Sequence, residues 1–324
     1  MKESKRRAAT ASPRGKDTKK ARKDIKMTIN RRSILIASGI GALGLGGVLA
    51  FAAGNSARAE TPLADLLART HIHGLAVDRQ DPNRLMIATH HGLHALDLET
   101  GLTVQVSDHR DDLMGFVAHP SEPGAFLASG HPARGGNLGV IVSSDGGATW
   151  VKLSDGVNGP VDFHQMDISK ADPSVVWGNF RGFQRSRDGG ATWERVADAP
   201  MGLIDIAASA RAPERLYAAT EVGLFVSAAD AQDWQRAHPA QAPVSFVEVT
   251  DDGLLYAFIL GEGLVRRTED EAEWERLHPG FEGRFLLYFA ADPQAPDRVF
   301  AATQEGEMLT SDDGGRSWRQ MGID

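Results

Sequence analysis

Residues 143–150 have the sequence SSDGGATW, and the same octapeptide returns as SRDGGATW at residues 186–193 and SDDGGRSW at residues 311–318. Two eroded copies lie between the second and third, SAADAQDW at residues 227–234 and RTEDEAEW at residues 267–274. The copies end in tryptophans spaced 43, 41, 40 and 44 residues apart: Trp150, Trp193, Trp234, Trp274 and Trp318. A period of this length predicts one supersecondary unit that is repeated along the chain.

The repeated unit has a constant internal order. A short apolar stretch is followed in most units by a Pro-containing corner, and a second apolar run follows, such as RLYAAT at residues 215–220. A turn, a third run, the octapeptide and a fourth run opening at tryptophan complete the unit, and LDLETGLTV at residues 96–104 is a sixth copy without the tryptophan. Short apolar and β-branched runs bounded by Gly, Pro and Asp are strands. Four such strands per period predict an all-β, six-bladed β-propeller, with seven blades as the alternative.

The octapeptide resembles the Asp box, also called the bacterial neuraminidase repeat. Its aspartate can accept hydrogen bonds from nearby backbone N–H groups in a turn, and its two glycines can adopt a positive φ that other residues avoid. The fourth and fifth units keep their strand patterns without the intact motif. We therefore predict structural, not catalytic, roles for the motif residues: Asp145, Gly146, Gly147, Trp150, Asp188, Gly189, Gly190, Trp193, Asp313, Gly314, Gly315 and Trp318.

Charge divides the chain into two unlike parts. Residues 1–32 contain 13 Lys and Arg against 3 Asp and Glu, whereas the chain from Glu60 onward contains 21 basic and 40 acidic residues. The acidic body argues against a nucleic acid partner, because phosphate binding needs clustered Lys and Arg. The chain has no cysteine, which excludes cysteine–zinc sites and cysteine nucleophiles.

The N-terminal segment resembles a twin-arginine signal peptide. Arg31 and Arg32 precede a Gly- and Ala-rich apolar run, and SARA at residues 56–59 provides a small-x-small cleavage site. We predict three regions: a disordered basic extension (1–26), the leader (27–59) and a β-propeller domain (60–324). The protein is expected to be exported to the periplasm or the extracellular space. In the alternative, an uncleaved leader anchors the protein in a membrane through residues 33–54.

Five of the eleven histidines fall within residues 71–96. In the predicted blades, the first strands begin on one face of the ring, and the turns between second and third strands lie on that same face, which we call the top face. Aligning Pro82 with Pro173 places His164 opposite His73. The candidate ligand-binding residues of the top face are His71, His73, His90, His91, His131, His164, Asn179 and Arg181. The carboxylates expected to face them are Asp112, Asp162, Glu221, Glu262 and Glu305.

These residues are expected to surround the mouth of the ring on its top face. Three interpretations of the mouth stay open. Imidazole combined with carboxylate suits a transition metal such as zinc or copper, with His71, His73 and His164 as candidate ligands. Alternatively, the same polar groups hydrogen-bond a small polar ligand or a glycan. In the third interpretation the mouth is a solvated rim whose histidines cap strand ends. No cofactor is therefore certain from the sequence.

From about residue 61 to residue 324, the chain resembles bacterial Asp-box propellers of the glycosylhydrolase-like or sialidase-like group, and more distantly sortilin-type and photosystem-assembly-factor propellers. Sialidases of this superfamily carry an Arg-Ile-Pro motif, which is missing here, so sialidase activity is not expected. The resemblance leaves another glycoside hydrolase as one alternative, with candidate catalytic carboxylates Glu221, Glu262, Glu305, Asp112 and Asp162. A protein-binding assembly factor is the second alternative. We favour binding over catalysis, because no catalytic constellation is apparent.

Overall fold

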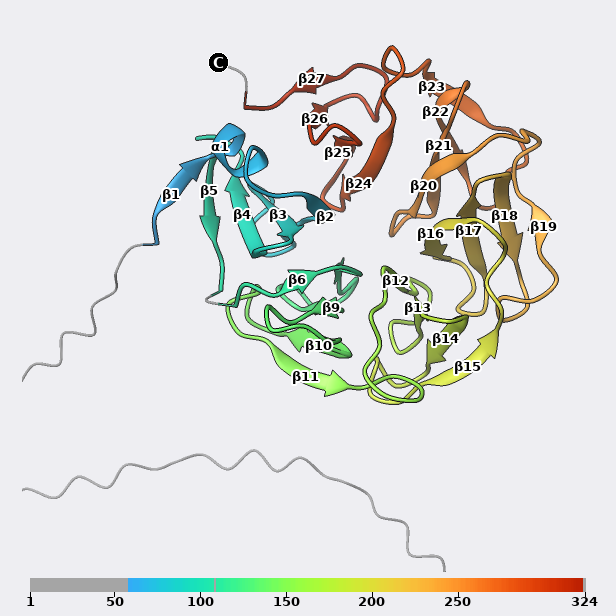
Figure 1. Cartoon of the computed structure of the whole chain (residues 1–324). Coiled ribbons are helices and arrows are strands. Elements are labelled where there is room, and N and C mark those ends of the chain that lie inside the picture. Colours follow the sequence, from blue (N-terminus) through green and yellow to red (C-terminus); the bar gives the residue numbers. More distant parts are fainter. Residues whose placement is uncertain (1–57, 108, 323–324) are drawn as a thin grey trace, which may run out of the picture. The chain divides into compact units, whose positions relative to one another are not determined.

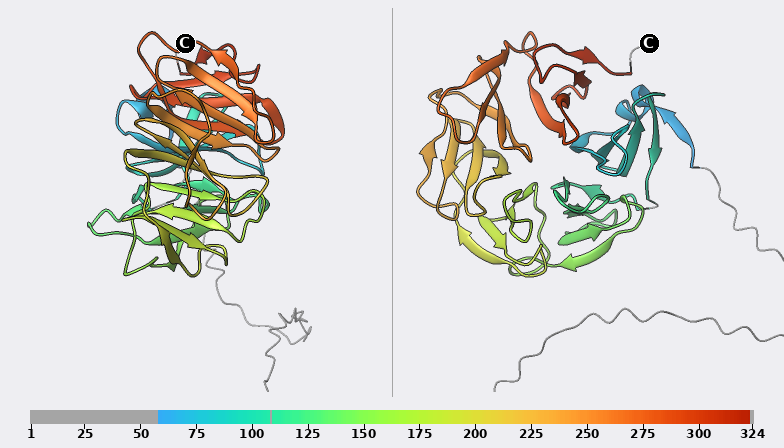
Figure 2. Two further views of the ribbon diagram at one scale, coloured as in Figure 1. Left: turned by 90° about the vertical axis from the view of Figure 1, so that its right-hand side faces the viewer. Right: turned by 180° about the vertical axis from the view of Figure 1, so that it is seen from behind.

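The computed structural model describes residues 58–107 and 109–322, so the predictions for residues 1–57 lie outside the described residues. The described residues form six small antiparallel sheets arranged in a ring, which is the predicted six-bladed β-propeller (Figure 1). Figure 2 shows the ring edge-on and from behind. The one helix of the described ranges is α1 (Leu63–Leu67). None of the described helical structure is long and apolar enough to cross a membrane.

The blades follow one another in chain order, and each is a four-stranded meander. Blade one contains β2 (Ile72–Val77), β3 (Arg84–Thr89), β4 (Gly92–Asp97) and β5 (Leu102–Gln105). Blade two contains β7 (Val117–Ala118), β8 (Phe126–Ala128), β10 (Val140–Ser143) and β11 (Val151–Ser154). Blade three contains β12 (Gln165–Ile168), β13 (Val176–Asn179), β14 (Phe183–Ser186) and β15 (Glu194–Ala197).

The second half of the ring repeats this arrangement. Blade four contains β16 (Leu203–Ala208), β17 (Leu216–Thr220), β18 (Gly223–Ser227) and β19 (Gln235–Arg236). Blade five contains β20 (Val244–Val249), β21 (Leu254–Ile259), β22 (Gly263–Thr268) and β23 (Glu275–His278). Blade six contains β24 (Leu286–Asp292), β25 (Ala295–Thr303), β26 (Met308–Ser311) and β27 (Arg319–Gln320). Two further pairings lie outside the meanders. Strand β1 (Glu60–Pro62) pairs with β5 and adds a fifth strand to blade one, and β6 (Asp112–Leu113) pairs with β9 (Gly130–His131) in a separate two-stranded sheet.

The hydrophobic core consists of six clusters, one between each pair of neighbouring blades. Because each blade packs on both sides, its second strand is buried on both faces and needs an unbroken apolar run. All residues of β17 are buried, which explains the RLYAAT pattern. The outermost strands β11 and β15 begin with exposed residues. The apolar runs of the sequence therefore mark the inner part of each blade.

Each intact octapeptide forms the same turn between the third and fourth strands of its blade. In blade three, Asp188 Oδ1 accepts hydrogen bonds from the Thr192 backbone N–H and the Ser186 hydroxyl, both at 2.8 Å. Asp188 Oδ2 accepts one from the Thr192 hydroxyl at 2.7 Å. The same bonds recur around Asp145 and Asp313. These carboxylates therefore serve as acceptors that close the turns.

The glycines and tryptophan of the octapeptide complete the turn. Gly189 and Gly190 have φ angles of 70° and 95°, which glycine adopts without a Cβ penalty. The Trp193 indole N–H donates to the Gly190 carbonyl at 2.9 Å. Its ring packs against Phe163, with the ring centroids 4.9 Å apart. The octapeptide thus connects its own turn to the interface with the preceding blade.

Acidification is expected to weaken these turns. Hydrogen bonds, first those from the hydroxyl and backbone N–H groups four residues later, hold the pKa of Asp145, Asp188 and Asp313 below the usual value. A carboxyl with a lowered folded pKa stabilises the protein above its unfolded pKa of about 3.9, and that stability is lost as the pH falls through the folded pKa. We expect Asp188→Asn to lower the melting temperature near neutral pH and to make its decline on acidification shallower, as measured by thermal melts. The exposed Glu99→Gln serves as control, and parallel acid profiles for Asp188→Asn and the wild type would contradict the assignment.

The ring closes without a strand shared between blades one and six, because β1 extends blade one and β24–β27 all come from the C-terminal part of the chain. Each of the other five interblade clusters contains one of the five repeat tryptophans. The cluster between blades one and six instead contains Leu63 and Leu66 of α1, packed with Phe300 and Met308. Helix α1 therefore fills the interface where blade one has no tryptophan to contribute.

Candidate metal centre

The first strand of blade one delivers a histidine to the mouth of the ring through a β-bulge. The pairing of β2 with β3 shifts register between Ile72 and Gly74, so His73 is the extra residue of the bulge. The first strands of blades four, five and six have a shift at the same place. Bulges redirect a side chain and are frequent beside functional sites. In blade one the redirected side chain is an imidazole, of which only 10% is exposed.

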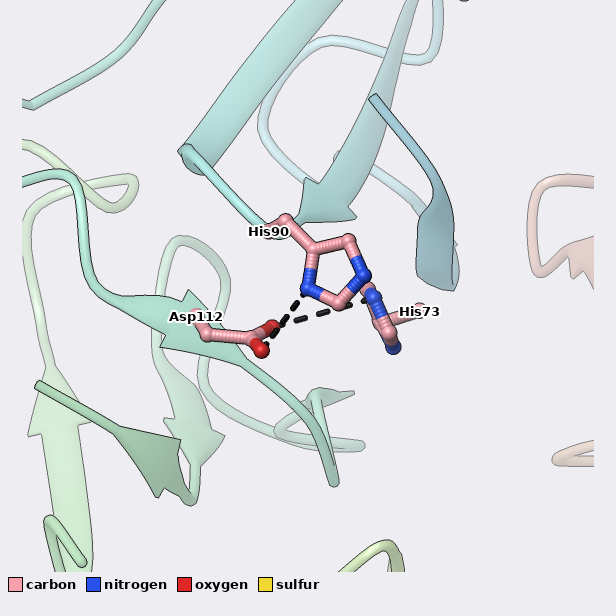
Figure 3. Close-up of side chains that lie close together, drawn as sticks. All are labelled: His73, His90 and Asp112. Atoms are coloured by element: carbon pink, nitrogen blue, oxygen red, sulfur yellow. Dashed lines mark hydrogen bonds and ion pairs between the residues drawn. The ribbon is translucent and has the colours of Figure 1, made fainter. Parts of the chain in front are cut away.

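Three side chains from three separate segments converge at this point, as Figure 3 shows: His73, His90 and Asp112. His90 lies in the turn between β3 and β4, and Asp112 belongs to β6. His90 Nδ1 is 2.8 Å from Asp112 Oδ2, and His73 Nε2 is 3.7 Å from Asp112 Oδ1. One potential ligand atom from each residue lies within 4.8 Å of the other two. We call these residues the first His/Asp group.

Several polar atoms of the first His/Asp group are buried without a partner. Nδ1 and Nε2 of His73 and Oδ1 of Asp112 have no hydrogen bond partner and essentially no exposed surface. A buried polar atom left unpaired costs about 1–3 kcal/mol, and native proteins usually satisfy such atoms with water or an ion. Burial also lowers the pKa of His73, which keeps the imidazole neutral, the form that binds metal ions. The group therefore has the residue types and the spacing that could hold a metal ion.

A second cluster, the second His/Asp group, consists of His131, Asp162 and His164. The Nε2 atoms of both histidines lie 2.9 Å from the same oxygen, Asp162 Oδ2. Asp162 is 8% exposed, and its other oxygen, Oδ1, is buried without a partner. The hydrogen bond with Asp162 raises the pKa of His164, and the charge of Asp112 adds to this effect. The two groups are therefore close enough to interact electrostatically.

Local packing sets the two groups side by side. Asp112 and His131 are paired residues of the β6–β9 ladder, so their side chains lie on the same side of it. The ladder requires a glycine at position 130, where φ is 136° and a Cβ would lie 2.0 Å from the Asp112 carbonyl oxygen. Between Asp162 and His164, the fully buried Phe163 faces the core, and its carbonyl accepts a hydrogen bond from the Gly115 N–H at 2.8 Å. The segment that carries Asp112 is thus held against the segment that carries Asp162.

The other predicted ligand-binding residues lie outside both groups. His71 is exposed, and its ring centroid is 5.5 Å from that of His90. His91 is exposed at the turn between β3 and β4. Asn179 ends β13, and its Oδ1 is buried without a partner. Arg181 is exposed and adopts a φ of 56° in the turn that follows. Of the three candidate metal ligands, the structure places His73 in the first group, His164 in the second and His71 in neither.

Only some of the predicted catalytic carboxylates belong to the two His/Asp groups. Asp112 and Asp162 belong to the two groups, whereas Glu221, Glu262 and Glu305 lie at the turns between the second and third strands of blades four, five and six. Glu221 and Glu305 are exposed, and Glu262 Oε2 is 3.6 Å from His238 Nε2. Within the described part of the chain, these three glutamates do not line the central cavity.

A cavity of about 330 Å³ lies between the first strands of all six blades, and His73 and His164 are part of its lining. Its wall also carries acidic side chains that the sequence interpretation missed: Asp167, Asp205 and Glu248. Burial raises the pKa of Asp205 to about 7 and also raises that of Glu248. Although 32% of the Glu248 side chain is exposed, Glu248 is part of the cavity lining. Loss of hydration is therefore still the largest cause of its raised pKa. The sequence contains a signal for these three residues: each is an acidic residue inside an apolar run, as in QMDIS, LIDIA and FVEVT.

Two of these cavity carboxylates, Asp205 and Asp167, connect neighbouring blades through hydrogen bonds. Asp205 Oδ2 accepts a hydrogen bond from the Val247 backbone N–H of the next blade at 3.0 Å. Asp167 Oδ2 accepts bonds from the Ala208 backbone N–H of the next blade and from Lys170 Nζ, both at 2.7 Å. These hydrogen bonds account for the presence of Asp205 and Asp167 in the inner strands without a ligand.

No protein-family model and no curated protein matches the sequence. Among solved structures, a GH74 xyloglucanase from Xanthomonas campestris is similar with a TM-score of 0.54 and 19% identity, over 78% of this chain and 45% of that chain. A GH74 enzyme from Niastella koreensis gives a TM-score of 0.55 and 13% identity, over 78% and 45%. A gluconolactonase from Xanthomonas campestris gives 0.55 and 16%, over 75% and 86%. The chain thus spans less than half the length of either GH74 enzyme, and the likeness shows the β-propeller fold alone.

Proposed function

We propose that this chain is an exported Asp-box propeller of the glycosylhydrolase-like group, and that it binds a divalent transition-metal ion at the first His/Asp group. Zinc and copper are the favoured ions, because imidazole and carboxylate are ligands that both accept. The observation that carries the proposal is the buried imidazole of His73, which has no hydrogen-bond partner at either ring nitrogen. It lies beside Asp112 Oδ1, which also has no hydrogen-bond partner.

The chemistry of the first group suits a bound ion that remains accessible. Two neutral imidazoles and one carboxylate supply three ligands, whereas zinc usually takes four, so one position is left for water or another small molecule. Because His73 lines the central cavity, that position would be reached from the cavity. The acidic chain from Glu60 onward, with 40 acidic against 21 basic residues, would also attract cations to the protein.

Glycan hydrolysis receives less support than metal binding. A glycoside hydrolase needs two carboxyl groups on either side of the sugar, one of them with a raised pKa. Asp205 and Glu248 have raised pKa values, but Asp205 and Asp167 already bond to the backbone of the next blade, and Glu248 Oε1 lies 3.7 Å from Lys170 Nζ. The similarity to glycan-acting enzymes is one of fold alone. We therefore place metal binding ahead of glycan hydrolysis.

The proposal is tested by measuring zinc and copper affinity in competition with a chromogenic chelator. The protein should be isolated from the periplasm, where N-terminal sequencing is expected to begin at Glu60. We expect His90→Ala to weaken binding by more than about 100-fold, because even residues that only support a metal ligand contribute about 10–100-fold.

His109→Ala is the matched control, because His109 is also an exposed histidine near the mouth, with 59% of its side chain exposed, and belongs to neither group. It should bind like the wild type. A wild-type protein that fails to compete with the chelator for either ion, or equal losses in the two variants, would refute metal binding at this group.

A further inference from the structure

The hydrogen bond between His131 and Gly136 leaves the other ring nitrogen of His131 facing a carboxylate. Its Nδ1 is 2.9 Å from the carbonyl oxygen of Gly136, which can only accept, so Nδ1 carries the proton. In a neutral imidazole the Nε2 atom then presents its lone pair, and it does so 2.9 Å from Asp162 Oδ2. Two acceptors at this distance repel each other unless a proton or a metal cation lies between them. The carbonyl of Gly136 thus orients His131 as a backbone partner orients a metal ligand.

The Asp162 carboxylate can accept more hydrogen bonds than the described residues donate to it. Its Oδ2 faces the Nε2 atoms of both His131 and His164 at 2.9 Å, while its Oδ1 has no partner although the residue is only 8% exposed. Two imidazoles and a buried carboxylate thus converge within 4.8 Å. This donor set matches that of the first His/Asp group in both residue type and spacing.

We propose that the second His/Asp group holds a second transition-metal ion, so that the mouth of the propeller is a two-ion centre. This inference rests on the proposed function of the first group and extends it. The β6–β9 ladder places Asp112 directly beside His131, and both His73 and His164 line the same cavity. Two ions held there would face one shared space.

The charges of the centre predict how the ions bind. Two divalent cations would be matched by two carboxylates, Asp112 and Asp162, so the loaded centre would carry a net positive charge. The first ion should therefore weaken the affinity for the second through Coulomb repulsion. We expect zinc to bind in two steps of different affinity.

The test is a zinc count on metal-stripped protein equilibrated in a zinc buffer and measured by elemental analysis. His90→Ala and His131→Ala remove one ligand from each group, and both side chains are 42% exposed, so their loss should leave the fold intact. We expect two equivalents in the wild type, one in each variant and none in the double variant. His109→Ala should retain two equivalents, and thermal melts confirm that each variant is folded.

The possible counts separate the two claims. One equivalent in the wild type that persists in His131→Ala and is lost in His90→Ala would overturn the second ion, since a proton would then satisfy the His131–Asp162 pair. It would leave the proposed function standing. One equivalent lost in both variants would overturn the two-ion centre in favour of a single ion shared by the groups. Two equivalents in His131→Ala would also overturn it. No zinc in the wild type would refute the proposed function as well.

Discussion

Phe163→Ala is expected to lower the free energy of unfolding by about 3–5 kcal/mol, the usual cost of removing a fully buried phenylalanine. For a domain of this size, that corresponds to a fall in melting temperature of roughly 6–20 °C. Phe163 has no exposed surface and packs against Trp193 between blades two and three. Thermal and urea melts would measure the loss.

The same substitution should also disturb the mouth, because Phe163 lies between Asp162 and His164. We expect Phe163→Ala to weaken zinc binding at the second His/Asp group more than at the first. Phe225→Ala provides the control, since Phe225 is a half-buried phenylalanine in blade four. It should cost less stability and leave zinc binding unchanged. Equal destabilisation by the two substitutions would contradict the anchoring role of Phe163.

Leu63→Ala is expected to cost about 2–5 kcal/mol of unfolding free energy, because it removes a buried side chain from the interface that closes the ring. Leu63 is 1% exposed and packs with residues of blade six. Because blade six does not contribute a strand to blade one, loss of this contact should loosen blade one in particular. Hydrogen exchange should accelerate in β2–β5 more than in the strands of blade four.

Asp65→Ala, on the same short helix, is the matched control because Asp65 is exposed. Surface substitutions of this kind usually change the free energy of unfolding by less than about 0.5 kcal/mol. A Leu63→Ala protein as stable as Asp65→Ala, with unchanged exchange in blade one, would show that α1 does not close the ring.

The repeat predicted the architecture because both the turn and the strand pattern are local. The octapeptides recur at nearly constant spacing, and runs such as RLYAAT need only their own blade and its two neighbours to become buried. The contact between blades one and six, which closes the ring, was less predictable. The missing tryptophan of blade one showed that something else must fill that interface, but a five-residue helix is too short to show a helical period.

The candidate site was predictable in its position but not in its partners. Repeat alignment placed His164 opposite His73 and put His90 at a neighbouring turn. It could not show that a bulge makes His73 the extra residue of β2, or that the β6–β9 ladder sets Asp112 beside His131. Both features depend on pairing between segments, which strand periodicity does not reveal. The cavity carboxylates Asp167, Asp205 and Glu248 were missed for a different reason, because the sequence interpretation gave no weight to single acidic residues inside apolar runs.

The most direct test of metal binding at the mouth is anomalous X-ray diffraction from crystals of the protein grown with zinc, recorded on both sides of the zinc absorption edge. Metal binding at the first His/Asp group predicts an anomalous peak about 2.0–2.2 Å from a nitrogen of His73, a nitrogen of His90 and an oxygen of Asp112. An anomalous map without a peak between these three side chains, from crystals equilibrated with saturating zinc, would contradict it.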